Sequence, residues 1–418
     1  MRICFVARTY PTRYFREGAG IDTQELARGL AQRGHDVHVV CTIRKGACGD
    51  EMDEGVCVHF VSLQRLRIRR ALRMLARMPG LHQFIDVYGG WDLAEFSLGA
   101  WLKVRSLHQQ QRFDVIQAVD TGGIALFGLL WPKRTIPIVI RGHGFVDPES
   151  PGMQWCGARF QYWLERFCLR RADYVLANSS YLCETYRAKF GLDTERVTVL
   201  HTGFHIPQPP VTLLDIRQER GWGGNDPVVL YVGRIEYLKG CDILFSAVQR
   251  AREHVANLRL VLLGQVQPSF QSSYDEFTAR NASWVWHPGN VSSDEVSCVM
   301  YQSALLVLPS RKETFGRVLV EAQLHGLSVI GTDIGGIPEI VTHGETGLLV
   351  QPGDAEGLSR AIVSLVEDEP CRRHIGELAF ASASRRFSLE SIVQQQNAFF
   401  SSLVAARTCP AVLKQDLS

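Results

Sequence analysis

Two glutamates, Glu313 and Glu321, are separated by seven residues and form the pair of carboxylates most suggestive of chemistry in this chain. The apolar run Leu305–Leu308 precedes them and predicts a short buried strand that ends in a loop. The stretch 318–324 follows and predicts a helix. Glu313 is therefore expected in the strand-to-helix turn. Glu321 is expected on the helix about a turn and a half from its start, at ~3.6 residues per turn.

The start of this helix is a candidate site for an anion. Backbone N–H groups in the first turn of a helix have no partner within it, and they lie at the positive end of its dipole. Gly316 would let a phosphate come close to the backbone. We expect a diphosphate on these amides and sugar hydroxyls on the two carboxylates. The amides concerned are those of Thr314, Phe315, Gly316 and Arg317.

Glutamates at this spacing also occur by chance, so the pair needs support from other parts of the chain. A basic loop, 233–240, follows the predicted strand Val228–Val232 and contains Gly233, Arg234 and Lys239. An arginine fork and the point charge of a lysine are both suited to a diphosphate. The alternative, if the loop stood alone, is an ordinary basic surface loop.

In the first half of the chain the candidate residue is His143. It follows the predicted strand Ile136–Ile140 and lies between two glycines, Gly142 and Gly144. In open parallel sheets, ligands bind beyond the carboxyl ends of the strands. The glycines would leave the imidazole ring room to reach a ligand. The alternative is a loop histidine with a local hydrogen bond.

The composition is that of a globular protein of two domains, with 418 residues, 46% hydrophobic and 21% charged, and a formal net charge of +2. This charge gives no reason to expect nucleic acid as a partner. The 11 cysteines include no C-x-x-C pair, which argues against a zinc site and against a secreted disulfide framework. We expect no membrane-spanning helix, because no run of about twenty apolar residues occurs. A cytoplasmic protein with reduced thiols is expected.

Strands and helices alternate along the whole chain, which predicts an α/β fold with two doubly wound, Rossmann-like parallel sheets. A proline-rich segment, 206–210, marks the boundary between them. The predicted domains are 1–205, 206–385 and a closing helix with a tail, 386–418, that packs back on the first domain. The other expected strands are Ile3–Ala7, Val37–Cys41, Val56–Val61, Asp114–Val119, Tyr174–Ala177, Val197–Leu200, Leu258–Leu263, Ser283–Trp286, Ser328–Gly331 and Leu348–Val350. The helices named are Asp22–Gln32, Asp92–Gln110, Ala158–Arg170, Asp242–Glu253 and Ser388–Ala405.

Two further stretches, a glycine loop and an arginine-rich segment, could contact a ligand or a membrane. Gly18 and Gly20 are expected in the loop before the first helix, although most glycine loops are only turns. The stretch 67–78 predicts a helix with an apolar face and an opposite face of arginines. This helix can pack on its domain, or it can contact an anionic membrane at the inner face.

Taken together, these residues resemble those of glycosyltransferase family 4, the retaining, nucleotide-sugar-dependent enzymes of the GT-B fold. The resemblance extends over nearly the whole chain. Its motifs occur in the family's order and spacing: Gly233-Arg234…Lys239-Gly240, Pro309-Ser310…Glu313-x7-Glu321, and Gly335-Gly336-Ile-Pro338-Glu339. A GT-B fold implies two domains that face each other across a cleft.

The resemblance also implies roles for individual residues. Arg234 and Lys239 would hold the diphosphate of the donor, Glu321 its ribose hydroxyls, and Glu313 the hydroxyls of the transferred sugar. His143 would contact this sugar. The other implied donor-binding residues are Gly18, Gly20, Gly233, Phe315, Gly316 and Arg317.

The implied activity is retaining transfer of a sugar from a UDP- or GDP-linked donor to a hydroxyl of a saccharide or lipid-linked acceptor, in glycan, polysaccharide or glycolipid biosynthesis. No cofactor and no metal are expected, since Arg234 and Lys239 would stabilise the leaving diphosphate. Two alternatives stay open: a sugar-nucleotide epimerase of GT-B-like fold, and a non-catalytic subunit that binds a nucleotide sugar.

Overall fold

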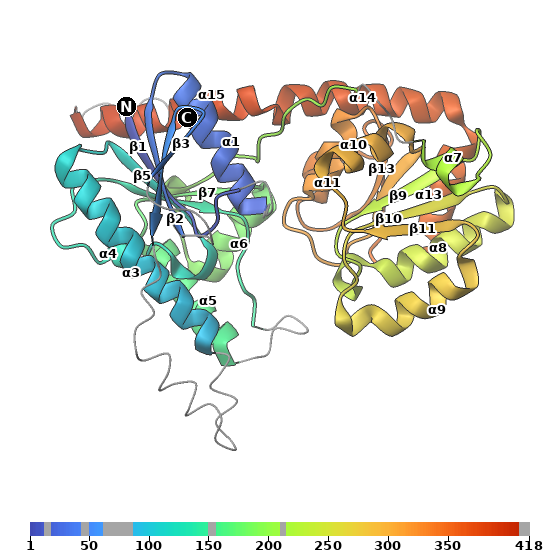
Figure 1. The fold of residues 1–418 in the computed structure, drawn as a ribbon, viewed down its shortest axis with the longest axis horizontal. Helices are drawn as coiled ribbons and strands as arrows, with labels where there is room; N and C mark the ends of the chain where they lie inside the picture. The colour runs from blue at the N-terminus through green and yellow to red at the C-terminus, as the bar shows by residue number, and fades with distance from the viewer. Residues whose placement is uncertain (12–17, 43–49, 62–86, 149–155, 210–214, 409–418) are drawn as a thin grey trace, which may run out of the picture. The chain divides into compact units, whose positions relative to one another are not determined.

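The structure, a computed structural model, describes residues 1–11, 18–42, 50–61, 87–148, 156–209 and 215–408. Its contacts divide the chain into two compact units. Unit 1 comprises Met1–Gly203 and Leu389–Ser418, and unit 2 comprises Phe204–Ser388. Figure 1 shows both units as sheets flanked by helices.

Unit 1 contains an eight-stranded sheet in the order β3-β4-β2-β1-β5-β6-β7-β8. All neighbouring strands are parallel except β3 and β4. Its strands are β1 (Arg2–Val6), β2 (Asp36–Thr42), β3 (Glu51–Asp53), β4 (Val56–Val61), β5 (Val115–Val119), β6 (Ile138–Gly142), β7 (Tyr174–Ala177) and β8 (Val197–Val199).

Two hydrophobic cores cover the two faces of this sheet. Helices α1 and α15 pack on one face, where Leu26 and Leu30 meet Ile392 and Phe400. Helices α3, α5 and α6 contribute to the core on the other face. The helices of unit 1 are α1 (Gly18–Gln32), α3 (Val87–Gln110), α4 (Leu126–Leu129), α5 (Cys156–Arg171), α6 (Ser180–Phe190) and α15 (Leu389–Thr408).

Unit 2 contains a six-stranded parallel sheet in the order β11-β10-β9-β12-β13-β14. Its strands are almost wholly apolar, as expected for a parallel sheet covered on both faces. They are β9 (Val228–Val232), β10 (Arg259–Leu263), β11 (Val285–Gly289), β12 (Leu305–Leu308), β13 (Ser328–Thr332) and β14 (Leu348–Val350).

Four of the helices that surround this sheet, α7, α10, α13 and α14, begin with a side-chain cap. Ser292, for example, forms a capping box with Glu295 at the start of α10. The helices of unit 2 are α7 (Ile216–Arg220), α8 (Cys241–His254), α9 (Gln271–Asn281), α10 (Ser293–Gln302), α11 (Arg317–Leu324), α12 (Ile337–Ile340), α13 (Ala355–Glu367) and α14 (Glu369–Phe387).

The predicted α/β fold with two doubly wound sheets is confirmed, with differences at particular ends. Helix α1 begins at Gly18, so the expectation that Gly18 and Gly20 lie in a loop is wrong. Strand β6 begins only after Pro137, which has no N–H to donate. The same strand continues past its predicted end through the buried Arg141.

Two predictions concern membranes, and the described residues bear on one of them. None of the helices among the described residues is both long and apolar enough to cross a membrane. The arginine-rich stretch 67–78 lies outside the described residues.

Candidate active site

In unit 2, the loops that carry the motifs leave adjacent strands at the middle of the sheet. Strands β10 and β11 lie on one side of β9 in the sheet, and the later strands, beginning with β12, lie on its other side. Such a point of reversal, at the carboxyl ends of the strands, is where doubly wound sheets bind ligands. The loop 233–240 follows β9, and the loop 309–316 follows β12.

An ion pair joins these two loops. Lys239 Nζ lies 2.7 Å from Glu313 Oε2, and the two side chains are 21% and 14% exposed. The other carboxylate oxygen, Oε1, accepts hydrogen bonds from the amides of Thr314 and Phe315, at 3.1 and 3.5 Å. The carboxylate of Glu313 therefore lies against a cation and two backbone N–H groups at once.

These contacts correct one prediction. The amides of Thr314 and Phe315 were expected to be available to an anion, but they donate to Glu313 in this structure. The physical reason is that a carboxylate in a turn can accept hydrogen bonds from the N–H groups of the residues that directly follow it. Helix α11 begins at Arg317, after Gly316 in the left-handed conformation at φ 102°.

Glycines let the loops approach one another at backbone distance. A Cβ atom on Gly240 would lie 1.9 Å from the carbonyl oxygen of Pro309, and one on Gly335 would lie 1.8 Å from that of Glu313. Gly336 also donates its N–H to Glu313 O at 3.2 Å. Larger residues at these positions would separate the loops and move Glu313 away from Lys239.

The sequence reasoning missed a second connection between the loops. Arg311 forms a two-pronged ion pair with Asp242, at 2.5 and 2.7 Å, and donates to the carbonyl of Tyr237 at 2.8 Å. Its guanidinium lies 3.8 Å from the centre of the Tyr237 ring. The available signal for this clamp was Asp242, an acidic residue two positions after Gly240 in the first turn of α8.

The remaining predicted residues of unit 2 lie around this loop pair. Arg234 is largely exposed, and its Nη2 lies 2.9 Å from Glu236 Oε1. Arg317 and Glu321 form an i,i+4 pair on α11 at 3.3 Å. Phe315 is buried and stacks on Phe204, so any role it has toward a ligand belongs to its backbone. Gly233 has a φ of 149°. A Cβ atom added to Gly264 would lie 2.1 Å from the carbonyl oxygen of Gly233.

In unit 1, His143 directly follows β6 and contacts a buried ion pair. Its Nε2 lies 2.9 Å from Asp22 Oδ2, and Arg141 Nε lies 3.0 Å from the same oxygen. The side chains of Arg141 and Asp22 are 0% and 1% exposed. Burial would raise the pKa of Asp22, but the Arg141 charge and the His143 hydrogen bond together hold it below its usual value.

The backbone of His143 is fixed by a second carboxylate, Asp120, which follows β5. Asp120 Oδ2 accepts from the amides of His143 and Gly144, at 3.0 and 3.1 Å, and from the Tyr186 hydroxyl at 2.7 Å. Burial raises the pKa of the Asp120 carboxyl above its usual value, because it outweighs these hydrogen bonds, which lower the pKa. His143 is therefore held by its ring and by its backbone.

Gly18 and Gly20 occupy the first turn of α1, the helix that also carries Asp22. A Cβ atom on Gly20 would lie 2.8 Å from Thr9 Oγ1 and 3.0 Å from Thr9 O. The close packing of this turn on the segment after β1 explains the need for glycine at position 20. It also sets the start of α1, and with it the position of Asp22.

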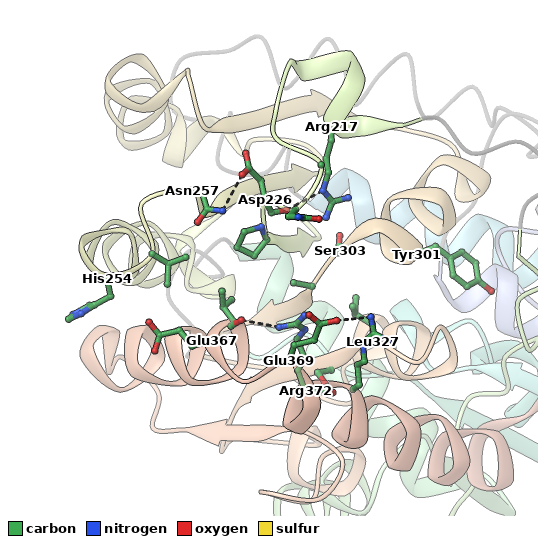
Figure 2. Close-up of a pocket in the computed structure, with 18 of the residues that line it drawn as sticks. Arg217, Asp226, His254, Asn257, Tyr301, Ser303, Leu327, Glu367, Glu369 and Arg372 are labelled. Carbon is green, nitrogen blue, oxygen red and sulfur yellow. Dashed lines mark hydrogen bonds and ion pairs between the residues drawn. The ribbon is translucent and has the colours of Figure 1, made fainter.

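Unit 2 also has a cavity of about 790 Å³, drawn in Figure 2. Its lining includes Asp226, Asn257, Ser303 and Leu327, which directly precede the parallel strands or lie within two residues of them. The cavity is therefore at the amino-terminal edge of the sheet, and none of the motif residues lines it. We place the candidate chemistry at the opposite edge, where the motif loops meet.

Two family models match the chain. The model described as "Glycosyl transferases group 1" matches residues 214–381, which belong to unit 2. The model described as "Glycosyl transferase 4-like domain" matches residues 17–203, which belong to unit 1.

Curated proteins resemble the chain over most of its length. N-acetyl-alpha-D-glucosaminyl L-malate synthase of Bacillus anthracis is 41% identical over 393 residues, 92% of this chain and 93% of that protein. Glycogen synthase of Mycobacterium tuberculosis (strain ATCC 25618 / H37Rv) is 26% identical over 388 residues, 88% of this chain and 86% of that protein.

A solved structure of HepE from Anabaena, in complex with UDP and glucose, has a TM-score of 0.70 at 23% identity and covers 96% of this chain and 100% of that chain. Sucrose-phosphate synthase from Thermosynechococcus elongatus has a TM-score of 0.76 at 20% identity and covers 97% and 99%. These two structures share the fold of this chain. The chain belongs to the group 1, GT4-like glycosyltransferases and has the GT-B fold.

Proposed function

We propose that this glycosyltransferase moves a sugar from a UDP- or GDP-linked donor to an acceptor hydroxyl, with retention of the anomeric configuration and without a metal ion. The observation that carries the proposal is the Lys239–Glu313 pair between the two motif loops of unit 2. This pair places a cation, a carboxylate and the start of a helix within one small region, as a sugar diphosphate requires.

In this proposal the donor binds along the carboxyl edge of the unit 2 sheet. Its diphosphate lies on Arg234, Lys239 and the amides of Phe315 and Gly316, and its ribose hydroxyls bind Glu321. Arg317, which pairs with Glu321, orients that carboxylate. His143 contacts the transferred sugar. Gly18 and Gly20, at the start of α1, face the phosphates of the donor.

Binding requires Glu313 to change partners. In the structure its carboxylate contacts Lys239 and two amides, the groups on which an anionic phosphate would be stabilised. A diphosphate that binds Lys239 would displace Glu313 and release its carboxylate to accept hydrogen bonds from the sugar hydroxyls. Donor binding would thus create the sugar-binding contact.

In the reaction, the bond between the anomeric carbon and the diphosphate oxygen breaks, and a bond to the acceptor oxygen forms on the same face. The leaving phosphate takes the proton of the acceptor hydroxyl. Arg234 and Lys239 stabilise the negative charge that develops on the diphosphate. Metal independence follows from this supply of fixed positive charge, which performs the task that a divalent cation has in other transferases.

The acceptor is proposed from chemistry shared by the relatives. The names of the two curated relatives include L-malate and glycogen, and both compounds carry hydroxyl groups. We therefore propose a hydroxyl acceptor, either a small hydroxy acid or a saccharide. A lipid-linked saccharide belongs to the same class.

The test is a turnover assay that combines UDP- and GDP-linked glucose and N-acetylglucosamine with L-malate and glycogen, with and without EDTA. The product of the active pair is examined by NMR. An α-linked product from an α-linked donor, formed at an unchanged rate in EDTA, supports the proposal. An inverted product contradicts retention, and complete loss in EDTA that Mg²⁺ restores contradicts metal independence. An altered nucleotide sugar without transfer would indicate the epimerase.

A further inference from the structure

We propose that the exposed face of α5 in unit 1 docks the protein on an anionic lipid membrane. This inference is separate from the donor site and from the acceptor hydroxyl. It rests on two features of one helix: a stripe of exposed, stacked aromatic rings, and a row of arginines beside this stripe.

The aromatic stripe consists of Phe160, Trp163 and Phe167. Phe160 is 45% exposed and Trp163 is 56% exposed, which is unusual for large apolar side chains on a soluble surface. The rings of Phe160 and Trp163 stack at 6.4 Å between centroids, and those of Trp163 and Phe167 at 5.7 Å. Spacings of three and four residues place them on one side of the helix.

Arginines border this stripe. Arg171 extends it, with its guanidinium 5.4 Å from the centre of the Phe167 ring. Arg159, Arg166 and Arg170 are exposed at positions that fall beside the aromatic residues at ~100° per residue. Among the described side chains of α5, the single carboxylate is Glu165, which is buried. The exposed face thus combines apolar rings with positive charge.

The chemistry of this face matches the boundary between lipid headgroups and acyl chains. Tryptophan and phenylalanine enter that boundary, while arginines on the flank reach the phosphates of anionic lipids. The neighbouring helix α3, which contacts α5, also carries two exposed leucines, Leu98 and Leu102.

A second copy of this chain fits the face less well. In a twofold interface the same patch meets itself, so the arginines of one copy would approach those of the other. Like charges across an interface oppose association. An anionic bilayer offers the opposite charge over a continuous surface.

The test is flotation of the full chain with vesicles of phosphatidylcholine, or of phosphatidylcholine mixed with an equal amount of phosphatidylglycerol, at low and high salt. The proposal predicts binding to the anionic vesicles that weakens with salt. The triple variant Arg159→Gln, Arg166→Gln, Arg170→Gln should bind more weakly by about fivefold per arginine, or roughly a hundredfold in all.

A matched triple variant controls for net charge. Arg280→Gln, Arg360→Gln and Arg373→Gln remove the same charge from exposed helical positions of unit 2. The control should bind vesicles as the native chain does. The double variant Trp163→Ser, Phe160→Ser should lose binding, whereas Leu378→Ser, Phe380→Ser on α14, at similar exposed positions, should not.

Insertion is measured separately by quenching with brominated acyl chains. The chain has 8 tryptophans, so quenching is compared between the native chain and Trp163→Phe, which keeps an apolar ring. Trp163→Phe should bind vesicles normally and lose most of the quenching. Thermal unfolding of every variant checks that the fold is intact.

Three results would overturn the proposal. The first is no preference for phosphatidylglycerol. The second is equal loss of binding in the two arginine triples, which would make the effect one of net charge. The third is a change from dimer to monomer in the α5 variants, measured by analytical ultracentrifugation, with unchanged vesicle binding. This third result would assign the face to a second copy of the chain.

Discussion

The ion pairs of the two units differ in how deeply they are buried. In unit 2, Lys239 and Glu313 are partly exposed, and each can exchange its partner for a ligand. In unit 1, Arg141 and Asp22 are buried, and each has the other as a partner that water cannot replace. In our account, the partly exposed charges of unit 2 serve the chemistry, while the buried charges of unit 1 hold a neighbouring residue, His143, in place.

The largest expected effect comes from breaking the buried pair. In Arg141→Met, Asp22 keeps His143 but loses its compensating charge, and removal of one partner of a buried ion pair costs about 3–5 kcal/mol. Urea unfolding followed by circular dichroism measures this loss in the free energy of unfolding. The matched variant Arg234→Met, at an exposed position, should lose less than about 0.5 kcal/mol. Equal losses would show that burial does not distinguish the two units.

The next effect separates donor binding from turnover. Glu313→Gln removes the carboxylate that competes with phosphate for Lys239, so binding of free UDP or GDP should stay the same or tighten. Turnover should fall by about 10²–10³-fold, the loss typical when one group that stabilises a transition state is removed. Calorimetry and initial rates give the two quantities. Weaker nucleotide binding in this variant would contradict the exchange of partners.

A smaller effect is expected at the Arg311–Asp242 clamp, which is partly exposed. Arg311→Gln and Asp242→Asn should each reduce turnover several-fold, because the loops that carry Lys239 and Glu313 lose a connection. A double-mutant cycle on unfolding should give a coupling of about 0.5–1 kcal/mol, the range for partly exposed pairs. Additive losses would show that the two side chains act independently.

The smallest effect is a pH dependence that Asp22 produces. Its pKa is below the usual value in the folded chain, so its charge contributes stability above about pH 4, the ordinary aspartate pKa, and this stability is lost as the pH falls further. Between pH 5 and pH 3 the native chain should lose stability more steeply than Asp22→Asn. Parallel curves would mean that Asp22 does not titrate with folding.

Several strands of both units have the predicted limits: β4 and β7 in unit 1, and β9, β12 and β14 in unit 2. Apolar runs bounded by loops mark such buried strands. The contact between Lys239 and Glu313 is a tertiary one and could not be predicted from either loop alone. The hydrogen bonds from the amides of Thr314 and Phe315 to Glu313 were also missed, since the same carboxylate was assigned to a ligand.

In unit 1 the errors concern residues whose environment depends on distant parts of the chain. Asp22 and Arg141 are 119 residues apart, and Asp22 has no local pattern that predicts its burial. The position of Arg141 at the end of an apolar strand signals that it has a buried partner, without indicating which residue that is. Strand β3 has three residues, too few for a periodic pattern.

The measurement that tests the central claim most directly is release of free nucleotide from the active donor–acceptor pair by the native chain and by Lys239→Ala. The account predicts that Lys239→Ala unfolds at the native temperature but loses about 10²–10³-fold in kcat/KM, with weaker binding of the nucleoside diphosphate. An intact fold with undiminished nucleotide release would contradict the placement of the donor diphosphate on the loops after β9 and β12.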